Sequence, residues 1–166
     1  VKYLTACEEL TFFSNANTFL KSLDPGPHIC TLTRLRRLDI SAYGLVSLPE
    51  EFTALKNLEY LNLSGNNFSS VPAILTPENF PNLHSLVLNA NQRQVIYDLS
   101  NTVKKDLGGL MDESLQDADG NRTFPKRLLR WDALDTLILS VNYLQGSLPS
   151  LEDDPDFPKW TRAEVE

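Results

Sequence analysis

The chain has 166 residues, of which 42% are hydrophobic, and this size and composition fit a single globular domain. Asp and Glu outnumber Lys and Arg by 22 to 15, and the net charge of −7 argues against a nucleic acid as partner. No apolar run approaches the roughly 18 residues that a membrane helix needs, so we expect no membrane insertion by this segment.

The first candidate repeat is LTFFSNANTFLKSLDP, which begins at Leu10. Its apolar residues follow a spacing that recurs later, but Asn15 falls at a leucine position and Thr18 at an asparagine position. We therefore expect a weak first coil near residue 10. Leu4 and Cys7 then fall in the linker before it. Because the chain starts inside a coil, we expect it to be a segment of a longer protein.

The two cysteines, Cys7 and Cys30, fall in the linkers of successive coils. A disulfide between them would suit an exported protein. We favour two thiols, because Cys7 falls at a core position equivalent to Leu55, where cysteine packs as a small hydrophobe.

Three copies of the pattern L-x-x-L-x-L follow, and they begin at Leu35, Leu58 and Leu83. Their spacings of 23 and 25 residues are typical of solenoid repeats. In each copy the L-x-L core predicts a short strand whose alternate side chains point to opposite faces. One face should form the core, and each coil should add its strand in parallel to the previous one.

An asparagine follows the strand in three copies, at Asn66, Asn91 and Asn142. We expect these amides to turn inward and satisfy backbone groups that the turning chain leaves unpaired. Tyr43 takes this place in the copy that begins at Leu35, and its phenol cannot make the same bonds. The asparagine ladder should therefore be weaker there.

Residues 92–127 are predicted to be an insertion, because the pattern stops after Asn91 and no further copy fits before Leu134. Within it, apolar residues from Val103 to Leu115 fall on one face of a helix. The helix is expected to cover apolar surface. The alternative is a recognition feature that projects from the solenoid.

The sequence DADGNRT, Asp117 to Thr123, resembles the start of a calcium loop. A calcium loop of this class needs Gly at its sixth position and Glu at its twelfth, where this chain has Arg122 and Leu128. We therefore predict an Asp-Gly turn and no metal site.

Calcium is expected to leave the melting temperature unchanged at millimolar concentration, because only a site formed in the folded state would raise it. Thermal melts with and without calcium test this. A rise of several degrees that disappears in Asp119→Ala would contradict the prediction.

The last copy, LDTLILSVNYLQGSLP, begins at Leu134 and carries one extra residue at Gly146. Its linker residues Leu128 and Trp131 correspond to Phe52 and Leu55, which precede Leu58. We expect these linker residues to close the outer side of the core.

These copies resemble the leucine-rich-repeat family over nearly the whole chain, apart from about residues 92–127 and the tail after residue 150. The resemblance implies an α/β-type solenoid, with short parallel strands on its concave face and an irregular or helical convex side. It would form a single domain over residues 1–166, of about five coils that start near residues 10, 35, 58, 83 and 134. The GSLP of the last copy is similar to secreted or surface-displayed proteins of the Bacteroides type, which implies a bacterial, extracellular or cell-surface protein.

The family serves mostly to bind other molecules, so the resemblance implies a binding module. We expect the partner, a protein or a glycan, to contact the outward side chains of the strands, here named the strand face. Aromatic and arginine residues are favoured in interfaces, and Val87 and Ile138 should stack on adjacent coils. The candidate binding residues are Arg37, Asp39, Tyr60, Asn62, Val87 and Ile138.

Nothing in the sequence indicates catalysis. His28 and His84 lack a nucleophile in a recognisable arrangement, and there is no phosphate loop, metal-ligand cluster or nucleophile motif. We therefore predict no catalytic residue, no metal site and no cofactor. Two alternatives to a binding module stay open: a spacer in a longer surface protein, and a non-catalytic targeting domain of an enzyme whose active site lies outside this segment.

Overall fold

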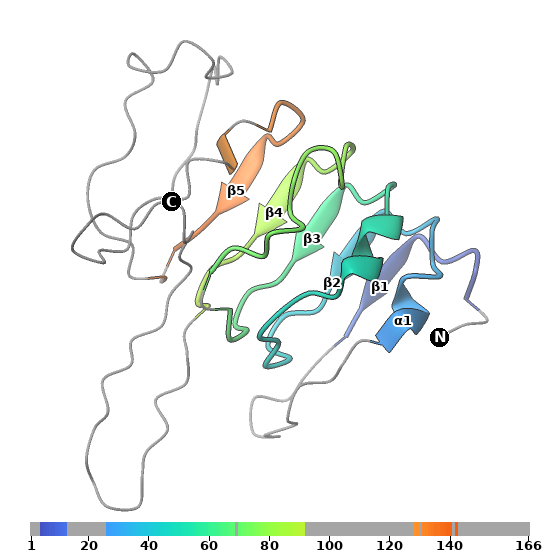
Figure 1. The fold of residues 1–166 in the computed structure, drawn as a ribbon, viewed down its shortest axis with the longest axis horizontal. Coiled ribbons are helices and arrows are strands. Elements are labelled where there is room, and N and C mark those ends of the chain that lie inside the picture. The colour runs from blue at the N-terminus through green and yellow to red at the C-terminus, as the bar shows by residue number, and fades with distance from the viewer. Residues whose placement is uncertain are drawn as a thin grey trace, which may run out of the picture.

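The computed structural model describes residues 4–12, 26–68, 70–91, 128–129, 131–140 and 142. Five short strands lie side by side in one parallel sheet, in chain order (Figure 1). They are β1 (Glu9–Thr11), β2 (Arg37–Asp39), β3 (Tyr60–Asn62), β4 (Ser85–Val87) and β5 (Thr136–Ile138).

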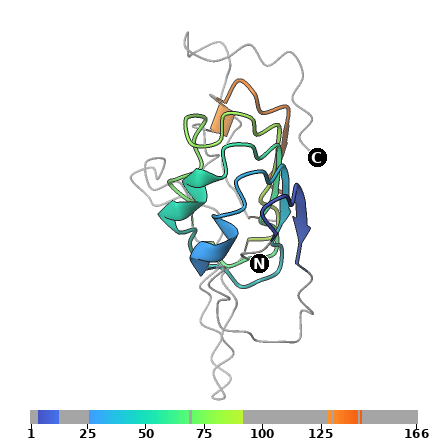
Figure 2. The same ribbon diagram turned by 90° about the vertical axis from the view of Figure 1, so that its right-hand side faces the viewer.

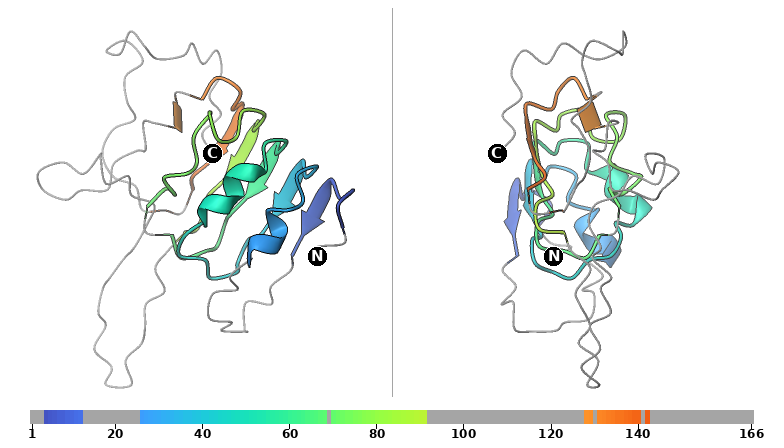
Figure 3. Two further views of the ribbon diagram at one scale, coloured as in Figure 1. Left: turned by 45° about the vertical axis from the view of Figure 1, so that its right-hand side comes forward. Right: turned by 90° about the vertical axis from the view of Figure 1, so that its left-hand side faces the viewer.

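Parallel strands in chain order require a return connection after each strand. The helical turns α1 (Gly26–Ile29) and η1 (Glu50–Ala54) belong to these connections and lie across the coil from the sheet (Figure 2). The right-hand view of Figure 3 shows the same separation of sheet and helical turns. The open stack of parallel strands confirms the predicted solenoid fold.

The strands pair in the register that the leucine pattern predicts from β2 onward. Leu38 lies opposite Leu61, Leu61 opposite Leu86, and Leu86 opposite Leu137. The first three are fully buried, because alternate residues of a strand share one face and these leucines all point into the core.

A repeated turn leads into every strand. The residue at the start of each repeat donates its backbone N–H to the carbonyl three residues earlier. These bonds are 2.8 to 3.2 Å long and join Cys7 to Leu4, Leu35 to Leu32, Leu58 to Leu55, Leu83 to Phe80, and Leu134 to Trp131.

Large apolar side chains fill the space between the sheet and the returning connections. Phe52 of η1 is fully buried, as are Leu55 and Leu128, and Trp131 is 1% exposed. The linker residues therefore close the outer side of the core.

The predicted start of the first coil near residue 10 is wrong by three residues. Leu10 lies opposite Leu38, so Cys7 starts the repeat. This register points Leu10 and Phe12 toward the core, where both are partly buried against it. The predicted register would instead have placed Asn15 at an inward position. Burying an apolar pair is favoured over burying an amide.

Cys7 consequently occupies the place of Leu35, not that of Leu55. It is half-buried, and its Sγ donates a hydrogen bond to the carbonyl of Glu9 at 3.0 Å. Cys30 is 7% exposed. Both residues are thiols in the structure, and no disulfide joins them.

The insertion does not interrupt the sheet, because β4 pairs directly with β5. The predicted helix from Val103 to Leu115 and the loop from Asp117 to Thr123 lie outside the described residues, as do Thr18 and the chain after Asn142. Within the described ranges, no helix is long and apolar enough to cross a membrane.

Candidate functional site

The strand face carries two rows of outward side chains, one residue per coil in each row. Parallel pairing in a common register brings the members of a row together. The first row is Glu9, Arg37, Tyr60, Ser85 and Thr136. The second row is Thr11, Asp39, Asn62, Val87 and Ile138.

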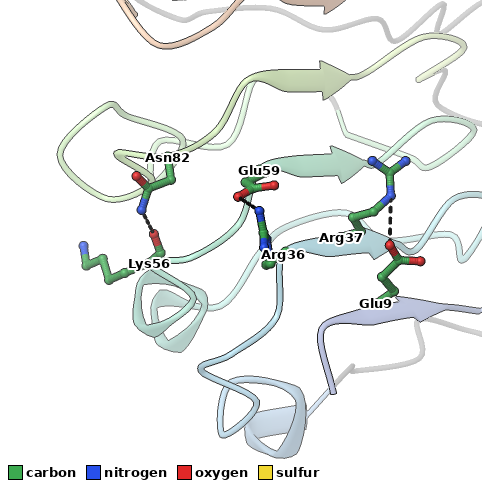
Figure 4. Close-up of polar contacts among 6 residues, drawn as sticks. All are labelled: Glu9, Arg36, Arg37, Lys56, Glu59 and Asn82. Carbon is green, nitrogen blue, oxygen red and sulfur yellow. Dashed lines mark hydrogen bonds and ion pairs between the residues drawn. The ribbon is translucent and has the colours of Figure 1, made fainter. Parts of the chain in front are cut away.

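Arg37 joins three neighbouring strands through its side chain. Its Cζ lies 4.3 Å from the centroid of the Tyr60 ring, which is a cation–π contact. On the other side its Nε lies 3.9 Å from Oε1 of Glu9 (Figure 4). The side chains of Arg37 and Glu9 are 52% and 74% exposed, so the ion pair itself adds little stability. The stack leaves a positioned guanidinium open to solvent.

Asp39 and Asn62 use their polar atoms within the protein. Asp39 Oδ1 accepts from the backbone N–H of Ser41, and Asn62 Oδ1 accepts from that of Ser64, each at 3.0 Å. Asn62 Nδ2 also donates to Asp39 Oδ2 at 2.8 Å. These two candidate residues therefore fix the turns after β2 and β3 and the joint between the two coils.

Val87 and Ile138 lie opposite each other at the apolar end of the second row. Val87 is only 9% exposed although it lies outside the main core cluster, and Ile138 is half-buried. Ile138 thus offers more accessible apolar surface than Val87. Only part of the predicted apolar pair is accessible.

The three asparagines after the strands form a buried ladder. Each amide nitrogen donates to its own strand end and to that of the preceding coil: Asn66 to Leu63 and Ile40, Asn91 to Leu88 and Leu63, and Asn142 to Leu139 and Leu88. All three residues are at most 2% exposed. The ladder therefore ties neighbouring coils together, including the two that flank the insertion.

The acceptor side of the ladder differs between coils. Asn66 Oδ1 accepts from the N–H groups of Tyr43 and Leu45, at 3.0 and 3.1 Å. Asn142 Oδ1 accepts from the N–H of Asn91 at 2.8 Å, whereas the buried Oδ1 of Asn91 has no hydrogen-bond partner among the described residues. Tyr43 offers no amide, and its ring packs edge-on against Phe12 at a centroid distance of 5.7 Å.

A second asparagine ladder was not predicted from the sequence. Asn57 Nδ2 donates to the carbonyl of Thr33 at 2.8 Å, and Asn82 Nδ2 donates to that of Lys56 at 2.9 Å (Figure 4). Both asparagines directly precede the first leucine of a repeat. The dipeptide Asn-Leu at the start of a copy is the signal that could have revealed it.

Charged residues line the start of the strands. Arg36 donates a hydrogen bond of 2.5 Å to Glu59, and this bond raises the pKa of Arg36 (Figure 4). Arg34 pairs with Glu8 at 3.0 Å. A shallow polar depression is lined by Arg34, Arg36, Asn57, Glu59 and Asn82. These cations already have carboxylate partners, so the depression is a surface network between coils.

No group of three or more potential metal-ligating side chains occurs among the described residues. His84 Nδ1 lies 3.8 Å from Oδ2 of Asp135, and both side chains are exposed. The pair joins the turns before β4 and β5. Among the described residues, no nucleophilic side chain is hydrogen-bonded to His84.

A family model described as "Leucine Rich repeats (2 copies)" matches residues 56–110, which include β3, β4, Asn66 and Asn91. The chain carries leucine-rich repeats. A solved leucine-rich-repeat protein from Leptospira interrogans is 26% identical, with a TM-score of 0.46. The match covers 74% of this leucine-rich-repeat chain and 29% of the Leptospira chain. Leucine-rich-repeat domains are typical of protein-interaction modules and are generally non-catalytic.

Proposed function

We propose that this leucine-rich-repeat chain binds a protein partner through its strand face, as part of a secreted or cell-surface protein. The observation that carries the proposal is the exposed stack of Arg37 on Tyr60. The similarity of the GSLP sequence to surface-displayed proteins of the Bacteroides type supports the location and a bacterial origin.

The stack suits an interface because its geometry exists before binding. Arginine and tyrosine are enriched among the residues that dominate binding energy. A side chain that is already held loses less conformational freedom when a partner arrives. Asp39 and Asn62 beside the stack are fixed by bonds to the turns and to each other, so this part of the strand face is rigid.

A protein is favoured over a glycan because one face of the Tyr60 ring already contacts the Arg37 guanidinium. That face is not available for a sugar ring to stack upon. The guanidinium itself offers several N–H donors in a planar fork, which matches carboxylates and main-chain carbonyls of a protein surface.

Arg37→Glu is expected to weaken binding of the native partner at least about tenfold, because the stack and the positioned donors are both lost. The partner is first captured with the 166-residue chain from its natural surroundings and then titrated in purified form by calorimetry. Tyr60→Ala should weaken binding to a similar extent.

Arg34→Glu is the matched control. It makes the same charge change at another exposed arginine that pairs with a glutamate, but in the turn before β2 instead of on the strand face. Equal losses in Arg34→Glu and Arg37→Glu would indicate general electrostatic attraction. Full binding by both Arg37→Glu and Tyr60→Ala would reject the strand face as the site and favour the spacer alternative.

A further inference from the structure

The turns after β2, β3 and β4 have the same backbone course. Ala42, Gly65 and Ala90 take matching positive φ angles of 59°, 66° and 54°. The N–H groups of these three residues donate to the next coil at the carbonyls of Ser64, Asn89 and Ser140, at 2.8 to 3.0 Å. The backbone N–H groups around these turns therefore point in corresponding directions.

Side chains of the second row of the strand face cap the turn after the strand in two of the described coils, those of β2 and β3. In β2 and β3 an outward Asp39 or Asn62 accepts from the N–H two residues later, at Ser41 or Ser64. This is the local bond that Asp and Asn side chains make in turns. The acceptor lies on the strand face, so the N–H of this turn residue is directed there.

In β4 and β5 the capping position is held by Val87 and Ile138, which have no polar side-chain atom. The bond to the N–H of Asn89 and Ser140 cannot be made by these side chains. Among the hydrogen bonds between described residues, none takes either N–H. Two adjacent coils thus present backbone donors roughly 4.8 Å apart, the spacing of neighbouring strands.

We infer that the N–H groups of Asn89 and Ser140, with the side chain of Ile138, form a subsite for a polypeptide segment that offers a carboxylate or carbonyl oxygen next to an apolar side chain. The oxygen takes the place that Asp39 and Asn62 oxygens hold in the preceding coils. The apolar group packs on half-buried Ile138, while Val87 contributes little accessible surface. This inference rests on the proposed function. It names the part of the partner that binds at the β4–β5 end of the strand face.

The chemistry of the subsite favours a polypeptide for two reasons. Asn89 and Ser140 are partly exposed, and a backbone donor that loses water when a partner arrives needs a new acceptor. A single oxygen between the two N–H groups can accept from both, and the two oxygens of a carboxylate can accept from one each. A polypeptide alternates carbonyl groups with side chains, so it places an acceptor beside an apolar group without special geometry. No charged residue occupies the outward positions of β4 and β5, so nothing there repels a carboxylate directly.

The test uses the 166-residue chain labelled with ¹⁵N and two probes, N-acetyl-leucine and N-acetyl-leucine methylamide. We expect saturable shifts of the amide signals of Asn89 and Ser140, with little change at Ser41 and Ser64, whose N–H groups are already capped. Binding of both probes assigns the acceptor to main-chain carbonyls. Binding of N-acetyl-leucine alone assigns it to a carboxylate.

Val87→Asn together with Ile138→Asn supplies the missing caps, and we expect the probe affinity to fall at least about tenfold because the donors are taken and the apolar contact is lost. Ile138→Asn alone, at a half-buried position, serves if the double variant does not fold. Ile138→Val is the conservative control and should keep the affinity within about twofold.

Absence of shifts at Asn89 and Ser140, or equal shifts at Ser41 and Ser64, would overturn the subsite. Unchanged probe affinity in Ile138→Asn would overturn it as well. If either result is found and Arg37→Glu still weakens binding of the native partner, only the subsite is rejected and the proposed function is retained. Full binding of the native partner by both Arg37→Glu and Tyr60→Ala would instead reject the proposed function, whatever the probes show.

Discussion

Phe52→Ala is expected to lower the free energy of unfolding by about 3–5 kcal/mol, the usual cost of deleting a large buried aromatic side chain. Phe52 is fully buried in η1, and its ring fills the outer side of the core in the second coil, between β2 and β3. Coils of a solenoid are stabilised by their neighbours, so a cavity in a central coil weakens stacking on both sides. Chemical unfolding followed by circular dichroism measures the change.

Glu51→Ala is the matched control, because it removes an exposed side chain from the same η1 segment. It should change the free energy of unfolding by less than about 0.5 kcal/mol. If Phe52→Ala also costs less than about 1 kcal/mol, the connection does not pack against the sheet as the structure shows.

Asn66→Ala is expected to lower the free energy of unfolding by about 3 kcal/mol, because it leaves several buried backbone groups without partners. The amide of Asn66 accepts from Tyr43 and Leu45 and donates to Ile40 and Leu63. In the variant each of these backbone groups either stays unpaired or forms a hydrogen bond with a water molecule that enters the space left by the amide. The measurement is again the free energy of unfolding.

Asn91→Ala should lower the free energy of unfolding less than Asn66→Ala, by about 1 kcal/mol, because Asn91 Oδ1 accepts no hydrogen bond from any residue that the structure describes. The two substitutions remove the same atoms at equivalent, fully buried positions, so the comparison isolates the acceptor side of the ladder. Equal costs would show that the N–H groups of Tyr43 and Leu45 do not depend on Asn66.

The leucine pattern alone predicted the fold class and the pairing from β2 to β5, because one apolar residue at every inward position leaves a single frame that buries them all. The first copy failed for a physical reason. Neighbouring Phe12 and Phe13 permit two frames, and the chosen one placed Asn15 inward. That frame buries an amide at a leucine position within the strand, where no turning backbone needs its hydrogen bonds. This should have argued against it.

The strand face was predicted only as positions, since the register places Arg37 beside Tyr60 but cannot supply the side-chain torsions that stack them. The turn-capping role of Asp39 and Asn62 was missed, although Asp and Asn side chains commonly bond to the backbone two residues further along the chain in turns. The low exposure of Val87 depends on its surroundings in three dimensions, which the pattern of alternation does not contain. The extent of the domain, residues 1–166, remains a prediction.

The direct pairing of β4 with β5 has a consequence for the entropy of the unfolded chain. Asn91 and Asn142 meet although they are 51 residues apart, whereas Tyr43 and Asn66 are 23 apart. Closing a flexible loop of twice the length costs only about 0.6 kcal/mol more. That is less than the gain from one buried hydrogen bond of the ladder, about 1 kcal/mol. The chain between these two coils can therefore lengthen, shorten or change its sequence over many generations while the strands on either side keep their contact.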